Sequence, residues 1–150
     1  MTKEERYDRT YLNMATEWAK LSHCSRKQVG ALIVKNGMII SDGYNGTPSG
    51  FENECENPIF DTDGTFLDYE TKWYVLHAES NALAKVPKST QSSEGSTLYV
   101  TMSPCRECSK LILQAGIKRV VYSESYRDSA GLDLLKKAGV DVVQISPEAE

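Results

Sequence analysis

Two short motifs constrain the fold and chemistry of this chain more than any other feature. The first is His77-Ala78-Glu79, and the second is Pro104-Cys105-Arg106-Glu107-Cys108. Zinc in proteins binds thiolate sulfur and imidazole nitrogen, so His77, Cys105 and Cys108 are candidate ligands. Three protein ligands leave the fourth tetrahedral position open to water, as in catalytic sites, whereas structural sites have four. The fold must therefore bring the two motifs to one point.

The cysteine motif is predicted to open a helix. Cys105 and Cys108 are three residues apart, so they share one helix face. Ser103 is a good N-cap and Pro104 a good first helical residue, which predicts a helix over residues 104–115. The helix dipole favours thiolate in the first turns, and thiolate is the form that binds zinc.

Glu79 is the candidate proton carrier. It lies two residues after His77 on a predicted helix over residues 77–85, so it points elsewhere and need not bind the metal. H-x-E with a downstream P-C-x-x-C is the signature of zinc-dependent nucleobase deaminases, in which zinc activates a water and the glutamate moves protons. A lone Cys-x-x-Cys is often a redox motif or half of a structural zinc site, but both motifs in this order favour a catalytic centre.

Length, charge and cysteine usage restrict the class of protein. A chain of 150 residues is expected to form a single domain over 1–150 with a full core. A net charge of -4 argues against nucleic acid as a partner, although it leaves room for a small basic pocket that binds one phosphate. We find no signal peptide and no membrane-spanning stretch, and two of four cysteines are assigned to metal, so we expect a reducing, cytoplasmic setting without a membrane partner.

Hydrophobic periodicity predicts an α/β fold. An amphipathic helix over 4–21 precedes two apolar strands, 29–34 and 38–43, joined at an Asn36-Gly37 hairpin turn. Strands and helices then alternate. The predicted elements are a helix over 77–85, a strand over 97–101, a helix over 104–115, a strand over 118–122, a helix over 130–138 and a strand over 140–145. We expect a three-layer α/β/α sandwich around a mixed five-stranded sheet.

With the motifs placed on these elements, the sequence resembles the cytidine deaminase superfamily over nearly its whole length. Within it, the chain is most similar to the deoxycytidylate (dCMP) deaminase family. The words that carry this resemblance are Cys24-Ser25-Arg26-Lys27-Gln28-Val29-Gly30-Ala31, Gly43-Tyr44-Asn45-Gly46-Thr47-Pro48-Ser49-Gly50 and His77-Ala78-Glu79-Ser80-Asn81-Ala82. The resemblance implies hydrolysis of dCMP to dUMP for thymidylate synthesis. It also implies a homohexamer that dCTP activates, with Mg²⁺, and dTTP inhibits.

The resemblance assigns expected roles to the segment Gly43-Tyr44-Asn45-Gly46. Asn45 matches an asparagine that contacts the sugar hydroxyl, and the whole segment matches the region associated with dCTP and dTTP sensing. Glycines let the backbone approach a ligand closely. The alternative for all four residues is a tight turn after a strand.

The phosphate requires cationic or N–H partners. Arg26, with Ser25 beside it, is the first candidate, because a guanidinium forks onto phosphate oxygens. Tyr126 and Arg127 are the second, since they follow a predicted strand and ligand crevices form at such strand ends. Ser103 lies close enough to the metal motif to contribute to substrate binding. A solvated surface position is the alternative for either arginine.

Two further regions are less clear from the sequence. Cys24 and Cys55 match positions that help bind a structural zinc in some relatives, but residues 56–76 supply no histidine or cysteine, so we do not expect a second zinc. The alternatives are two free thiols or a Cys24–Cys55 contact without metal. Residues 51–70 carry seven acidic and no basic side chains, which favours a surface insertion, with an active-site flap as the alternative.

Two other functions remain open at this point. One is a deaminase of another substrate, such as free cytidine or an adenosine in transfer RNA. The other is a non-catalytic zinc-binding or nucleotide-sensing module, which a fourth protein ligand at the metal would favour.

Overall fold

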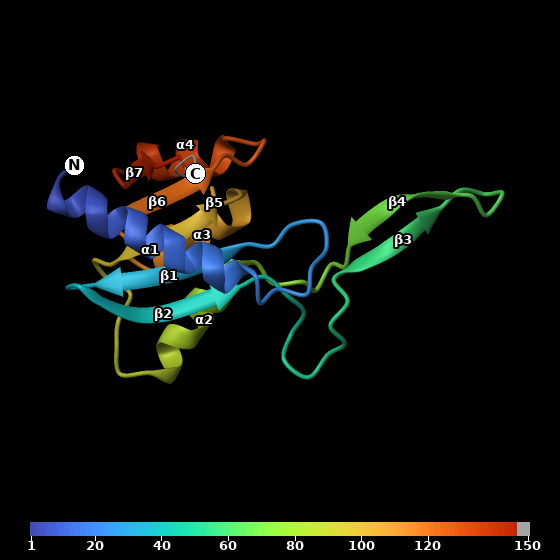
Figure 1. The fold of residues 1–150 in the computed structure, drawn as a ribbon, viewed down its shortest axis with the longest axis horizontal. Coiled ribbons are helices and arrows are strands. Elements are labelled where there is room, and N and C mark those ends of the chain that lie inside the picture. The colour runs from blue at the N-terminus through green and yellow to red at the C-terminus, as the bar shows by residue number, and fades with distance from the viewer. Residues whose placement is uncertain (147–150) are drawn as a thin grey trace.

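The computed structural model describes residues 1–146. It is an α/β structure built on a five-stranded sheet in the order β2-β1-β5-β6-β7 (Figure 1). The elements are α1 (Lys3–Ala19), β1 (Gly30–Lys35), β2 (Met38–Tyr44), β3 (Glu56–Phe60), β4 (Phe66–Thr71), α2 (Ala78–Lys85), the 3₁₀ helix η1 (Val86–Lys88), β5 (Thr97–Met102), α3 (Arg106–Gln114), β6 (Arg119–Glu124), α4 (Ala130–Lys137) and β7 (Asp141–Gln144). The predicted fold class is confirmed.

Helices cover both faces of the sheet and give three layers. On one face α1 packs on the sheet through a core that includes Leu12, Ala15 and Tyr99. On the other face α2, α3 and α4 share a larger core, with Ala82, Ile112 and Leu135 buried against the strands. No helix within residues 1–146 combines the length and apolar character needed to cross a membrane.

The strand directions bring the ends of several strands to one edge of the sheet. β5 and β6 run parallel, while β1 is antiparallel to both β2 and β5. The carboxyl ends of β2, β5 and β6 therefore meet the start of β1 at the same edge. Ligand crevices form at such strand ends in open α/β sheets, so this edge is where a site is expected.

Two glycines permit close packing beside that edge. A Cβ atom on Gly30 would lie 2.0 Å from the Ala15 carbonyl oxygen of α1, and one on Gly43 would lie 2.4 Å from the Ala78 carbonyl oxygen of α2. Any larger side chain would push these helices off the sheet. Gly43 is thus required for seating α2, the helix that carries Glu79.

The structure refines one expectation about the elements and corrects two. Residues 51–70 were expected to be a surface insertion, and the structure shows that β3 and β4 form an antiparallel hairpin that extends away from the body (Figure 1). The α3 helix begins at Arg106 rather than 104, with Cys105 and not Ser103 at its N-cap. Likewise His77 is the N-cap of α2 rather than its first helical residue.

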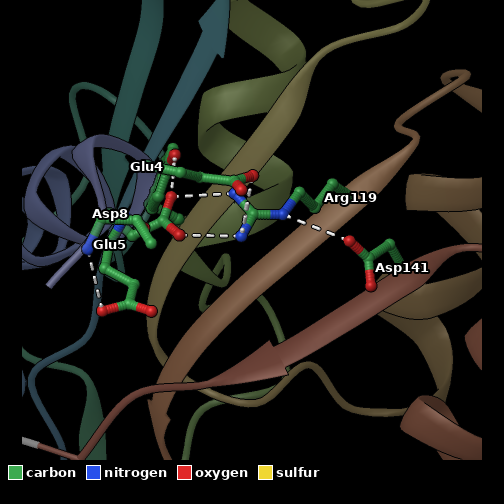
Figure 2. A network of polar contacts seen from close by, with 7 residues as sticks. Glu4, Glu5, Asp8, Arg119 and Asp141 are labelled. Carbon is green, nitrogen blue, oxygen red and sulfur yellow. Dashed lines mark hydrogen bonds and ion pairs between the residues drawn. The ribbon is translucent and has the colours of Figure 1, made fainter.

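An ion-pair network around the buried Asp8 lies at the starts of β6 and β7, opposite the strand ends described above. Figure 2 shows its members Glu4, Asp8, Arg119 and Asp141. Asp8, which is 2% exposed, accepts two hydrogen bonds from the Arg119 guanidinium at 2.8 and 2.7 Å. The Tyr99 hydroxyl donates to the same carboxylate at 2.6 Å. Burial alone would raise the Asp8 pKa, but the Arg119 and Tyr99 hydrogen bonds outweigh it and the pKa is lowered. This network fixes α1 to β5 and β6.

Candidate metal centre and active site

The three predicted zinc ligands come together between α2 and α3. Cys105 is the N-cap of α3, Cys108 lies one turn into it, and His77 is the N-cap of α2. Neither N-cap side chain bonds to its own helix, so both are available to a metal. The His77 Nδ1 lies 3.3 Å from the Cys108 Sγ and 3.5 Å from the Cys105 Sγ. Within the described residues, these three form the cluster of candidate ligand atoms, all within 4.8 Å of one another.

The electrostatics of this cluster favour a thiolate. Hydrogen bonds from Cys108 and then His77 lower the pKa of Cys105 to about 3. The same hydrogen bond with Cys105, reinforced by burial, raises the pKa of Cys108. The hydrogen bond to Cys105 also raises the pKa of His77 against the effect of burial. Two sulfurs and one imidazole suit zinc and leave one tetrahedral position open, so the residues present fit the metal.

Glu79 sits beside the cluster without belonging to it. Its side chain is 4% exposed and lies in the first turn of α2. Burial raises the pKa of Glu79, with the neighbouring His77 partly opposing this effect. A carboxyl group with a raised pKa can both accept and return a proton near neutrality. This arrangement suits a general acid–base rather than a fourth ligand.

A cavity of about 520 Å³ joins the cluster to the basic residues predicted for phosphate. One part of its wall is formed by His77, Glu79 and Cys105. Elsewhere the wall contains the predicted substrate residues Arg26, Asn45, Ser103, Tyr126 and Arg127. Ser25 is not part of the wall, and its hydroxyl donates to Glu56 at 3.0 Å. The structure therefore brings all but one of the predicted substrate residues to a single cavity.

Asn45 and Ser103 hold the cavity wall in place. The Asn45 amide donates to the Lys27 carbonyl at 2.7 Å and accepts from the Val29 N–H at 2.9 Å. The Ser103 hydroxyl accepts from the Tyr126 N–H at 2.6 Å. Each side chain thus fixes a neighbouring loop. Their direct contact with a sugar or base stays a prediction.

The segment Gly43-Tyr44-Asn45-Gly46 is tied to the metal centre. The Gly46 N–H donates to the Leu76 carbonyl at 3.0 Å, and the Leu76 N–H donates to the Gly46 carbonyl at 2.8 Å. Leu76 directly precedes His77. The Asn81 amide on α2 donates to the Tyr44 carbonyl at 2.8 Å. A ligand that displaced this segment would therefore also displace α2. Sensing of an effector by this segment stays a prediction.

Cys24 and Cys55 form a disulfide. Of the alternatives for this pair, a direct contact without metal is therefore the correct one. The other alternative, two free thiols, is wrong, because folding brings the two sulfurs together across 31 residues. The bond joins the loop before β1 to the base of the β3–β4 hairpin.

Sequence analysis missed several residues of the cavity wall. These are Lys27, Val29, Glu56, Thr71, Val75, Met102 and Ser125. Met102 and Ser125 lie at or just after the ends of β5 and β6, so the strand-end rule could have found them. Glu56 and Thr71 belong to the hairpin, which the sequence placed near the site only through the alternative of an active-site flap.

Comparison with known proteins agrees with this geometry. The model of the "Cytidine and deoxycytidylate deaminase zinc-binding region" matches residues 5–124. Deoxycytidylate deaminase of Enterobacteria phage T2 is 35% identical, with 91% of this chain and 90% of that protein covered. The mouse (Mus musculus) deoxycytidylate deaminase is 41% identical over 87% of this chain and 74% of its own.

Solved structures extend the similarity to three dimensions. A dCMP deaminase from the cyanophage S-TIM5, crystallised with dCMP and dUMP, superposes with a TM-score of 0.82 at 45% identity. That match covers 97% of this chain and 99% of the other. The described fold, the zinc-type cluster and these relatives agree, and the chain belongs to the cytidine and deoxycytidylate deaminase family.

Proposed function

We propose that this protein hydrolyses dCMP to dUMP and ammonia and so supplies dUMP for thymidylate synthesis. The proposal rests on one cavity whose wall contains two kinds of residue. One kind is the candidate metal ligand His77 and the candidate acid–base group Glu79. The other kind is basic, namely Arg26, Lys27 and Arg127. The cations can bind the 5′-phosphate of dCMP, and the acid–base group can transfer protons during loss of its exocyclic amine. The phage T2, mouse and S-TIM5 relatives named above carry dCMP deaminase names.

The chain's own residues can perform the proton transfers. His77, Cys105 and Cys108 would hold zinc, which when bound lowers the pKa of a water in its open position towards neutrality. Glu79 would take one proton from the attacking water and deliver it to the ring nitrogen beside the amine, while the water oxygen bonds to the amine-bearing carbon. It then carries the second proton to the departing amine, so that ammonia leaves and the carbonyl of dUMP remains. Burial of Glu79 raises its pKa and supports this exchange.

The phosphate subsite would distinguish dCMP from deoxycytidine. Arg26 and Arg127 line the cavity, and Lys27 lies beside Arg26. Tyr126 is held by Ser103, which fixes the start of the loop that presents Arg127. Guanidinium groups bind phosphate through paired, charge-assisted hydrogen bonds.

Regulation by nucleoside triphosphates is part of the proposal. We assign activation by dCTP with Mg²⁺, inhibition by dTTP and a homohexameric state on the resemblance of Gly43-Tyr44-Asn45-Gly46 to the sensing segment. The bridge between Gly46 and Leu76 supports it, because Leu76 directly precedes the ligand His77. Binding at this segment would thereby change the position of the metal centre.

The direct test is ultraviolet-monitored deamination of dCMP and of deoxycytidine, each with and without dCTP plus Mg²⁺. We expect turnover of dCMP, little turnover of deoxycytidine, and activation by dCTP. Equal turnover of both substrates would retain the zinc chemistry and reject the phosphate subsite. Turnover without any response to dCTP would reject only the regulatory assignment.

Replacing Arg127 by glutamate is expected to raise the KM for dCMP by about a hundredfold, since a charge-assisted hydrogen bond of about 1.5–3 kcal/mol becomes a repulsion. The KM for deoxycytidine should change little, because that substrate has no phosphate. Steady-state kinetics on both substrates measures the difference. Arg6→Glu on the exposed side of α1 makes the same charge change outside the cavity and serves as control. An equal effect on both substrates would show that Arg127 does not contact the phosphate.

A further inference from the structure

Three donors of the loop before β1 converge on the carboxylate of Glu56. The Glu56 Oε1 accepts the backbone N–H groups of Ser25 and Arg26 at 3.0 and 3.1 Å. Its Oε2 accepts the Ser25 hydroxyl at 3.0 Å. Glu56 is half-buried, is the first residue of β3, and lines the same cavity as Glu79.

This set of donors has the chemistry of a phosphate site. Consecutive backbone N–H groups form a concave nest for an anion, and a hydroxyl beside them adds a third hydrogen bond. The Arg26 guanidinium donates to the Tyr69 carbonyl at 3.0 Å through Nη1, which uses one of its five N–H groups. Lys27 and Arg127 line the same cavity. The group that fills the nest in this structure is the protein's own carboxylate.

We propose that Glu56 occupies the phosphate subsite of the empty enzyme, and that the 5′-phosphate of the substrate displaces it from Ser25 and Arg26. This inference rests on the proposed dCMP deaminase function. A phosphate dianion and a carboxylate repel each other at hydrogen-bonding distance, so they do not share the nest. Glu56 therefore weakens the binding of every ligand that places a phosphate in this nest.

The exchange requires little movement of the main chain. Cys24 and Cys55 directly precede Ser25 and Glu56, and their disulfide holds the two backbones together. The Lys72 N–H also bonds the Cys55 carbonyl at 2.7 Å, which closes the base of the hairpin. The Glu56 side chain can consequently rotate away while the nest stays formed. Side-chain rotation of this kind is fast compared with turnover.

The test compares Glu56→Gln with the wild type on three ligands. We expect the KM for dCMP to fall about fivefold or more, as the loss of one competing charge-assisted contact predicts. The inhibition constant of inorganic phosphate, measured as a competitor of dCMP, should fall by a similar factor. The KM for deoxycytidine should change far less than the KM for dCMP, because deoxycytidine has no phosphate to compete with Glu56. Glu70→Gln removes the same charge from an exposed position on β4 and should alter none of these values.

A rise or no change in the KM for dCMP with Glu56→Gln would overturn the proposal and make Glu56 a support of the loop. Thermal unfolding shows whether that variant is folded. If it is not, Ser25→Ala gives the second test, since removing a nest donor should raise the KM for dCMP but not for deoxycytidine, and equal effects would reject the nest. Failure of the proposed function looks different, because the wild type itself would then not prefer dCMP.

Discussion

Replacing Glu79 by glutamine is expected to lower the kcat for dCMP by about 10²- to 10⁴-fold, the range typical for removal of a general acid–base group. The upper end is expected, because the same carboxyl group serves two successive proton transfers. Glutamine preserves the shape of the side chain but cannot accept and return a proton. Glu79 lies outside the cluster of His77, Cys105 and Cys108, so zinc content should remain that of the wild type.

Three measurements together check this expectation. They are steady-state kcat for dCMP, metal content per chain, and the affinity for dUMP, which needs no proton transfer to bind. Glu107→Gln is the matched control, since Glu107 is an exposed acid on α3 that pairs with Lys110. Turnover within a few-fold of the wild type would remove Glu79 from the mechanism. Loss of zinc together with activity would mean instead that Glu79 maintains the metal site.

The metal centre could be predicted from sequence because chemistry limits its spacing. Cys and His are common zinc ligands, and two cysteines three residues apart can approach one metal from one helix end. The exact start of that helix was predicted wrongly. Ser103 and Pro104 carry local N-cap signals, but Ser103 instead bonds to the Tyr126 N–H across the sheet edge. A tertiary contact thus overrode the local signal.

The five-stranded sheet was predictable for a similar reason. Its strands have continuous apolar runs, such as the buried residues 31–34 in β1, because helices cover both faces. The β3–β4 hairpin has no such signal. Every residue of β4 is exposed, so no buried face imposes alternation on its sequence. The role of Glu56 was equally hidden, since its partners lie 30 and 31 residues away and meet it only through the fold.

The second large effect concerns stability rather than chemistry. Asp8→Asn is expected to lower the free energy of unfolding by about 3–5 kcal/mol, as for removal of one partner of a buried ion pair. The Arg119 side chain is 14% exposed and that of Asp8 is 3% exposed, so the substitution leaves a largely buried cation with weaker partners. Glu4 and Asp141 approach the same guanidinium at 3.5 and 3.3 Å but are mostly exposed (Figure 2). They can offset only part of the loss.

Urea unfolding of the wild type, Asp8→Asn, Arg119→Met and the double variant measures this effect as a double-mutant cycle. The double variant should lose less stability than the two single variants combined, because neither charge is then left alone in the core. Glu17→Gln is the control, since its ion pair with Lys20 is exposed and should contribute less than about 1 kcal/mol. Strict additivity of the two single variants would show that Asp8 and Arg119 do not stabilise each other.

The same pair predicts how stability depends on acid. The Asp8 pKa is lowered from 3.8 in the folded protein by the Arg119 and Tyr99 hydrogen bonds, which outweigh burial. A carboxyl group with a depressed folded pKa stabilises the protein fully above its unfolded pKa, and this contribution is lost as the pH falls towards the folded pKa. Below about pH 4 the wild type should therefore lose stability more steeply than Asp8→Asn, which has no group to protonate there. Parallel pH profiles for the two proteins would mean that the carboxylate of Asp8 is not the charge that Arg119 requires.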